Sequence, residues 1–208
     1  MAMINTAIPV PKFKFNEPRR NLPGRKGIAT AEDRFTIAFM HAYLAQAEAT
    51  HGEANSFQIA FAREIPVNGY GITDLLVVTW RVLPDESFPS GEAFAKVARP
   101  VCRAFEMKLF NWQKALSQAS RYRYFAHQPI VVLPPDACVN ALRVMDTFRR
   151  VKVGLWSFDP KINRIVTHFT PRPHRPRSPK YWFQSLEKAA RTSMSVLPIR
   201  EIVESHRA

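Results

Sequence analysis

The hydrophobic positions along the chain switch several times between helical spacing and strand spacing. From Phe35 to Tyr43 apolar residues recur every three or four positions, and with Thr30 as an N-cap and Gly52 beyond the last turn they predict a helix over 30–51. Apolar runs bounded by Gly, Pro and Asn predict strands. The expected strands are 57–65, 72–80, 101–109 and 129–133, with a hairpin of 153–158 and 165–169, and the further expected helices are 112–126, 136–148 and 181–194.

In this order, the elements predict a mixed α/β domain in which helices flank a central sheet. We expect three regions: a basic, proline-rich arm (1–28), the α/β domain (29–170), and a basic, proline-rich loop with a C-terminal helix (171–208). The polar segment 83–100 is expected to be a loop. The last helix begins with an aromatic cluster that either packs on the same chain, which we favour, or docks on a second subunit.

The charge of the chain adds a prediction about binding to the prediction of the fold. The 208 residues include 30 Lys and Arg against 17 Asp and Glu, a formal net charge of +13. Such an excess is typical of proteins that bind polyanions, above all nucleic acid, although a merely solvated basic surface would have the same composition. The cations cluster in the arm and in the run from Arg172 to Lys180, where prolines prevent a helix.

Several classes of protein are excluded by what the sequence lacks. No run approaches the roughly 18 apolar residues of a membrane-spanning helix, and residues 1–28 have no apolar core of a signal peptide. We therefore expect a cytoplasmic protein that does not enter a membrane. Cys102 and Cys138 lie in apolar runs, which predicts buried thiols rather than a disulfide. The sequence has no Gly-x-x-x-x-Gly-Lys-Ser/Thr loop, so it is not a self-contained ATPase.

Two carboxylates in strand segments are the best candidates for chemistry. Asp74 interrupts the apolar strand 72–80, where an unpaired charge would be costly. Glu106 and Lys108 are two residues apart in another strand, so they share a face and lie roughly 7 Å apart. If the strands are neighbours, the two carboxylates and the carbonyl of Met107 can hold Mg²⁺, beside which Lys108 would position or deprotonate a nucleophile. The alternative is a structural ion pair at a strand end.

The motifs around these residues resemble the PD-(D/E)xK nuclease superfamily. The segments that carry the resemblance are Gly69 to Val77, Phe105 to Lys108, and Gln118 to Tyr122, and it covers roughly residues 30–135. The Gln-x-x-x-Tyr element is similar to the helicase-associated exonuclease branch, while Thr73 stands at the position of the motif's proline. The resemblance implies a restriction-endonuclease-like fold with an αβββαβ core. It also implies Mg²⁺ or Mn²⁺ on Asp74 and Glu106, a catalytic Lys108, and Gln118 and Tyr122 beside the metal.

Other residues are candidates for supporting roles. By the same resemblance Glu32, in the first helix, is a further metal ligand, although a carboxylate there also complements the helix dipole. Glu64 is expected to be an exposed carboxylate at a strand end. The candidate phosphate contacts are Lys114, Arg121 and Arg123 on the helix and Arg172, Arg175 and Arg177 in the basic loop.

Together these observations predict a magnesium-dependent nuclease that hydrolyses phosphodiester bonds, with DNA as the expected substrate. The alternative is a non-catalytic nucleic-acid-binding or assembly subunit that retains the nuclease fold. A protein that binds membrane surfaces or acidic proteins through its cationic tails is the weaker third alternative, because it leaves the strand carboxylates unexplained. We expect the domain to act as a homodimer or beside a partner subunit. The sequence does not decide between DNA and RNA, and it leaves the strandedness and the cleavage mode open.

Overall fold

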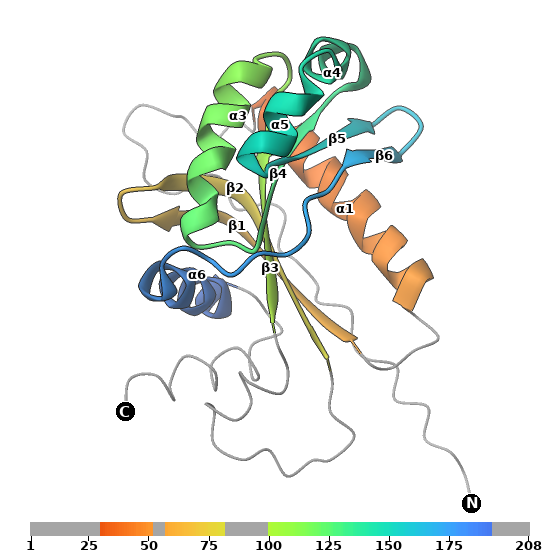
Figure 1. The fold of residues 1–208 in the computed structure, drawn as a ribbon. Coiled ribbons are helices and arrows are strands. Elements are labelled where there is room, and N and C mark those ends of the chain that lie inside the picture. Colours follow the sequence, from red (N-terminus) through yellow and green to blue (C-terminus); the bar gives the residue numbers. More distant parts are fainter. Residues whose placement is uncertain (1–29, 52–56, 82–99, 193–208) are drawn as a thin grey trace, which may run out of the picture.

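A computed structural model describes residues 30–51, 57–81 and 100–192 (Figure 1). The predicted N-terminal arm, residues 83–99 of the predicted loop and the chain after residue 192 lie outside the described residues. In chain order the elements are α1 (Ala31–His51), β1 (Phe57–Val67), β2 (Gly71–Arg81), β3 (Val101–Met107), α3 (Trp112–Arg121), the 3-10 helix η1 (Tyr122–Tyr124), β4 (Gln128–Leu133), α4 (Pro135–Leu142), α5 (Met145–Val151), β5 (Gly154–Asp159), β6 (Arg164–Phe169) and α6 (Pro179–Thr192).

The strands form one six-stranded mixed sheet in the order β1-β2-β3-β4-β5-β6. Neighbouring strands are antiparallel from β1 to β3 and between β5 and β6, whereas β3, β4 and β5 run parallel. Parallel neighbours need a crossover, and α3 and the α4–α5 pair supply the two crossovers. All six residues of β4 are buried, as expected for a parallel strand at the centre of a sheet. The predicted mixed α/β class is confirmed.

Helices cover both faces of the sheet (Figure 1). On one face α1 packs through Phe35, Phe39 and Tyr43. The ring of Phe35 contacts that of Phe158, and the rings of Phe39 and Tyr43 contact those of Phe105 and Trp156. On the other face α3, α4, α5 and α6 bury a second apolar cluster against the even-numbered side chains of β3. The predicted three-layer arrangement, a sheet between helices, is therefore present.

Several predicted boundaries differ in the structure. The strand expected over 101–109 ends at Met107, so Lys108 follows β3 instead of lying in it. The expected helix over 136–148 is two helices, because the chain leaves helical geometry at Val144 (φ −118°, ψ 30°). Ala141 and Phe148 are both buried and seven residues apart, so the helical spacing continues across the break and hides it. The helix expected over 112–126 ends at Arg121 and continues as η1. The final helix starts at Pro179, two residues earlier than expected.

The C-terminal segment folds back on the domain. Leu186 and Ala189 of α6 are buried in the cluster that also contains α3, and the indole Nε1 of Trp182 donates to Cys102 Sγ at 3.3 Å. The prediction that this helix packs on its own chain is confirmed. The chain before it is fixed as well, since Gln128 Nε2 donates to the carbonyl of Pro171 at 2.7 Å.

Both cysteines are free and buried, as predicted. Burial raises the pKa of the Cys102 thiol to about 12 and that of the Cys138 thiol to about 11, so neither is a thiolate at neutral pH. Within the described residues, no helix combines the length and the apolar character needed to cross a membrane.

Candidate active site

The candidate site lies where β2 begins and β3 ends. The paired residues of these strands end at Leu75 and Phe105, and one further step of the antiparallel register places Asp74 opposite Glu106. Asp74 Oδ2 accepts a hydrogen bond from the backbone N–H of Met107 at 2.8 Å. The sheet therefore brings the two predicted carboxylates to the same place on adjacent strands.

Thr73 connects the same two strands beneath the site. Its hydroxyl group lies 3.1 Å from the carbonyl oxygens of both Leu75 and Phe105, and the residue is fully buried. Thr73 stands where the nuclease motif has proline. Proline could not make this contact, because it has no side-chain donor. The threonine thus fixes the start of β2 against Phe105, the residue that precedes Glu106.

Glu106 is a buried carboxylate with a polar partner on each oxygen. The residue is only 1% exposed. The Tyr122 hydroxyl lies against Oε2, and Lys108 Nζ lies 3.0 Å from Oε1. The pKa of Glu106 is raised to about 7, because burial and the nearby charge of Asp74 raise it by more than Lys108 and Tyr122 lower it. A substantial fraction of Glu106 is therefore protonated near neutral pH.

Lys108 is surrounded by oxygen atoms. Its Nζ lies 3.0 Å from Glu106 Oε1, donates to the carbonyl of Met107 at 3.0 Å, and lies 3.5 Å from Glu32 Oε2. Burial alone would lower the pKa of Lys108, but Glu106, Asp74 and Glu32 raise it by more, so the net pKa lies above its ordinary value. Lys108 is consequently an ammonium ion at neutral pH.

The sequence left two roles open for Glu32, a metal ligand or a carboxylate that complements the helix dipole, and its contacts bear on both. At the start of α1 the capping contacts are made by its neighbour: Thr30 N donates to Asp33 Oδ2 at 2.8 Å, and Asp33 N donates to Thr30 Oγ1 at 3.1 Å. Glu32 instead reaches Lys108. The structure therefore places Glu32 at the rim of the site, in contact with the lysine.

Tyr122 joins the site at Oε2 of Glu106, whereas Lys108 lies at Oε1. Its ring is buried, and its hydroxyl donates to the carbonyl of Ile72 at 2.8 Å as well as meeting Glu106. Burial and the charge of Glu106 raise the pKa of Tyr122, so the phenol remains protonated. The glutamine of the Gln-x-x-x-Tyr element, Gln118, makes no comparable contact through its side-chain oxygen. Its Oε1 is buried, and no donor in the described part of the chain reaches it.

Glu64 is not the exposed strand-end carboxylate that the sequence predicted. It lies inside β1, is partly buried, and by the β1–β2 register stands opposite Asp74. Its φ of 51° is in the left-handed region, which non-glycine residues rarely adopt. This residue reverses the alternation of the strand, because Ala62 and Ile65, three positions apart, face the same core cluster.

The oxygen atoms of this site suit a hard divalent cation. Two carboxylates from Asp74 and Glu106 and the carbonyl of Met107 match the donors that Mg²⁺ and Mn²⁺ prefer, and Mg²⁺ keeps several water ligands. Across the described ranges, no group of three or more His, Cys, Asp and Glu side chains is arranged to hold a metal ion. The residues fit an ion that binds the two carboxylates and completes its coordination shell with water. Glu32 is not among these ligands.

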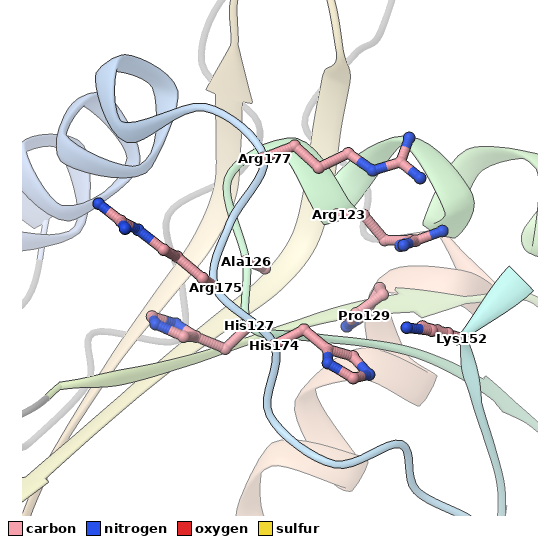
Figure 2. A pocket seen from close by; sticks show the side chains of 8 residues that line it. All are labelled: Arg123, Ala126, His127, Pro129, Lys152, His174, Arg175 and Arg177. Carbon is pink, nitrogen blue, oxygen red and sulfur yellow. The ribbon is translucent and has the colours of Figure 1, made fainter.

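The predicted phosphate contacts divide into two groups. Arg121 lies beside the β1–β2 turn, where a Cβ added to Gly71 would be 3.9 Å from its guanidinium. Lys114 is exposed on α3 and Arg172 is exposed in the loop, and neither lines the pocket described next. Arg123, Arg175 and Arg177 line one pocket together with three basic residues that were not predicted, Lys152, His127 and His174 (Figure 2).

The comparisons with known proteins leave the assignment to the geometry. No protein-family model matches the chain, and a search of curated proteins finds no relative.

The sequence analysis missed Ile72, whose carbonyl accepts a hydrogen bond from Tyr122, and Lys152, which lines the pocket. A backbone carbonyl has no sequence signal, and a single lysine after a helix is too common to be one.

Proposed function

We propose that this protein is a metal-dependent nuclease with a restriction-endonuclease-like core, and that DNA is its substrate. The observation that carries the proposal is the buried carboxylate of Glu106, which meets Lys108 and Tyr122 and lies one strand from Asp74. A buried carboxylate of this kind is destabilising unless it is compensated. The compensation here consists of groups that also suit phosphodiester hydrolysis.

The charge of the site supports a divalent ion. With Glu106 ionised, Asp74, Glu106 and Glu32 carry three negative charges against the single positive charge of Lys108. The raised pKa of Glu106 has burial and Asp74 as its causes, and an added cation would oppose both. Asp74, Glu106 and the carbonyl of Met107 would hold the ion. When bound, it would polarise the phosphate and lower the pKa of a coordinated water.

The other side chains have roles that follow from their protonation. Lys108 is an ammonium ion, so it stabilises negative charge that develops on the phosphate and does not act as the base. Its Nζ shares Met107 O and Glu106 Oε1 with the candidate metal ligands, so Lys108 would turn towards the substrate when a divalent ion binds. Tyr122 remains protonated and orients Glu106 through a hydrogen bond.

The alternative is a nucleic-acid-binding subunit in which Lys108 permanently neutralises the carboxylates. Cleavage of labelled single- and double-stranded DNA and RNA, with Mg²⁺ or with a chelator, separates the two. We expect Mg²⁺-dependent cleavage by the parent, and a loss of at least about 100-fold in Glu106→Gln. Asp146→Asn is the matched control, because that carboxylate is 86% exposed on α5 and pairs only with Arg149 among the described residues. Cleavage that persists in the chelator, or in Glu106→Gln, would contradict the proposal.

A further inference from the structure

A cluster of basic residues lies outside the carboxylate site, where the loop before α6 crosses η1 and the end of α5. The pocket is lined by Arg123, Lys152, Arg175, Arg177, His127 and His174, and none of the described acidic residues lines it. Figure 2 shows the side chains of Arg123, Arg177, Lys152 and His174 on one side of the loop and Arg175 on the other. Three fixed positive charges therefore share one small space.

The loop that carries Arg177 is held in place by its backbone. The N–H of His174 donates to the carbonyl of His127 at 3.1 Å, that of Arg177 to Arg123 at 3.0 Å, and that of Ser178 to Tyr124 at 3.0 Å. The guanidinium of Arg177 also lies over the Tyr124 ring, 5.5 Å from its centroid. The cations are therefore pre-positioned, which reduces the entropy lost when an anion binds.

The remaining two cations are fixed from the α5 side. Arg123 donates to the carbonyl of Val151 at 3.3 Å, which brings it next to Lys152. Lys152 ends α5 with φ 57°, a left-handed conformation that is unfavourable for lysine. Asparagine adopts this conformation more readily than lysine. A lysine at this position is consistent with a role for its charge.

The cations in the pocket repel one another, as the pKa values of two of its basic groups indicate. Partial burial lowers the pKa of His174, and the charges of Lys152 and Arg123 lower it further. Burial likewise lowers the pKa of Arg123, with Arg177 acting in the same direction. No carboxylate of the described residues forms an ion pair with Arg123, Lys152 or Arg177. An anion of one or two charges would relieve this repulsion.

The pocket is adjacent to the candidate active site through one step of the chain. Tyr122, which contacts Glu106, and Arg123, which lines the pocket, are consecutive residues, with Cα atoms about 3.8 Å apart. Their side chains serve different sites. The two sites are therefore joined by a single peptide unit.

We propose that the pocket formed by Arg123, Lys152 and Arg177 binds a single phosphate group of the nucleic-acid strand held at the Asp74–Glu106 site. This inference rests on the proposed function. The phosphate is either a terminal monoester, with a charge close to −2, or an internal diester, with a charge of −1. Arginine and lysine bind both through charge-assisted hydrogen bonds.

The test measures affinity for internally labelled DNA, single-stranded and duplex, in a chelator that prevents cleavage. Each DNA carries a 5′-phosphate, a 3′-phosphate or only hydroxyl ends. Lys152→Asn keeps a residue suited to the left-handed backbone and removes the charge, and Arg177→Gln is an independent second variant. Lys161→Asn in the exposed β5–β6 turn is the matched control. We expect both pocket variants to bind about tenfold more weakly than the control, with a salt dependence lower by about one ion.

The outcomes separate the two sources of phosphate and the two proposals. A loss confined to DNA with one phosphorylated end identifies a terminal phosphate, and an equal loss for all ends identifies an internal one. Pocket variants that bind like Lys161→Asn would overturn the pocket assignment, and Mg²⁺-dependent cleavage by the parent in that case would leave the proposed function intact. A parent that neither binds nor cleaves any of these nucleic acids would overturn both.

Discussion

The hydroxyl of Tyr122 lies between the Glu106 carboxylate and the carbonyl of Ile72, and so contacts two acceptors with a single proton. If Glu106 is protonated, both contacts can be hydrogen bonds, because Glu106 can donate to the phenolic oxygen while Tyr122 donates to the carbonyl of Ile72. Burial and the charge of Asp74 raise the pKa of Glu106 to about 7 and so favour this protonated form. The tyrosine thus couples the start of β2 to the protonation of the central carboxylate.

Replacing Tyr122 with Phe removes this hydrogen-bond donor while keeping the ring. Because the hydroxyl favours the ionised form of Glu106, we expect the pKa of Glu106 to rise further and metal-dependent cleavage to fall by about tenfold or more at pH 7. Stability should fall by about 1–2 kcal/mol in chemical denaturation. Tyr43→Phe is the control, since its hydroxyl accepts from Arg103 NH1 at 2.9 Å, away from the site. Equal cleavage by the two variants would show that Tyr122 has only a packing role.

The pH dependence of stability tests the raised pKa of Glu106 directly. The folded-state pKa, about 7, is above the ordinary value of 4.5, so the folded protein binds this proton more tightly than the unfolded chain. This contribution to stability is complete below about pH 4.5 and is lost as the pH rises through 7. In a chelator, we expect the unfolding free energy of the parent to fall by roughly 1–3 kcal/mol relative to Glu106→Gln across that range.

The comparison with Glu106→Gln removes the effect of other groups. Burial lowers the pKa of His127 to about 4, and this histidine changes stability with the opposite sign over the same acidic range. Both proteins retain His127, so its contribution cancels in the difference. A difference that does not change between pH 4.5 and 8 would contradict the raised pKa.

The packing of α6 gives a prediction about stability alone. Leu186 is fully buried against the core, so Leu186→Ala should destabilise the protein by roughly 2–4 kcal/mol, measured by denaturant titration. Ile162→Ala in the β5–β6 turn is the control, because Ile162 is 64% exposed and should change stability by less than about 0.5 kcal/mol. If Leu186→Ala unfolds like the control, α6 does not contribute to the core of its own chain.

The strand carboxylates could be predicted because their placement depends on short-range rules. The period of two places Glu106 and Lys108 on one face, and an antiparallel neighbour brings Asp74 opposite Glu106. Glu32 could not be assigned in this way. Both of its candidate roles need a carboxylate in the first turn of a helix, and only the tertiary contact with Lys108 distinguishes them.

The parts that escaped prediction depend on the conformation of single residues. The break at Val144 preserves the seven-residue spacing from Ala141 to Phe148, so the pattern of apolar residues does not reveal it. The left-handed Lys152 belongs to the pocket only because α5 ends there and the C-terminal loop crosses beside it. The pocket joins segments more than twenty residues apart, and no local pattern of residues reveals it.

The measurement that tests the central claim most directly is the single-turnover rate of DNA cleavage with Mg²⁺ by the parent and by Lys108→Met, each at saturating protein. Lys108 contacts the side chain of Glu106 and the carbonyl of Met107, and it does not line the cationic pocket. The affinity for DNA in a chelator should therefore change by less than about threefold in Lys108→Met. The account predicts that cleavage in Lys108→Met falls by at least about 100-fold. A parent that binds DNA yet cleaves none of the substrates, or a Lys108→Met variant with an unchanged rate, would contradict it.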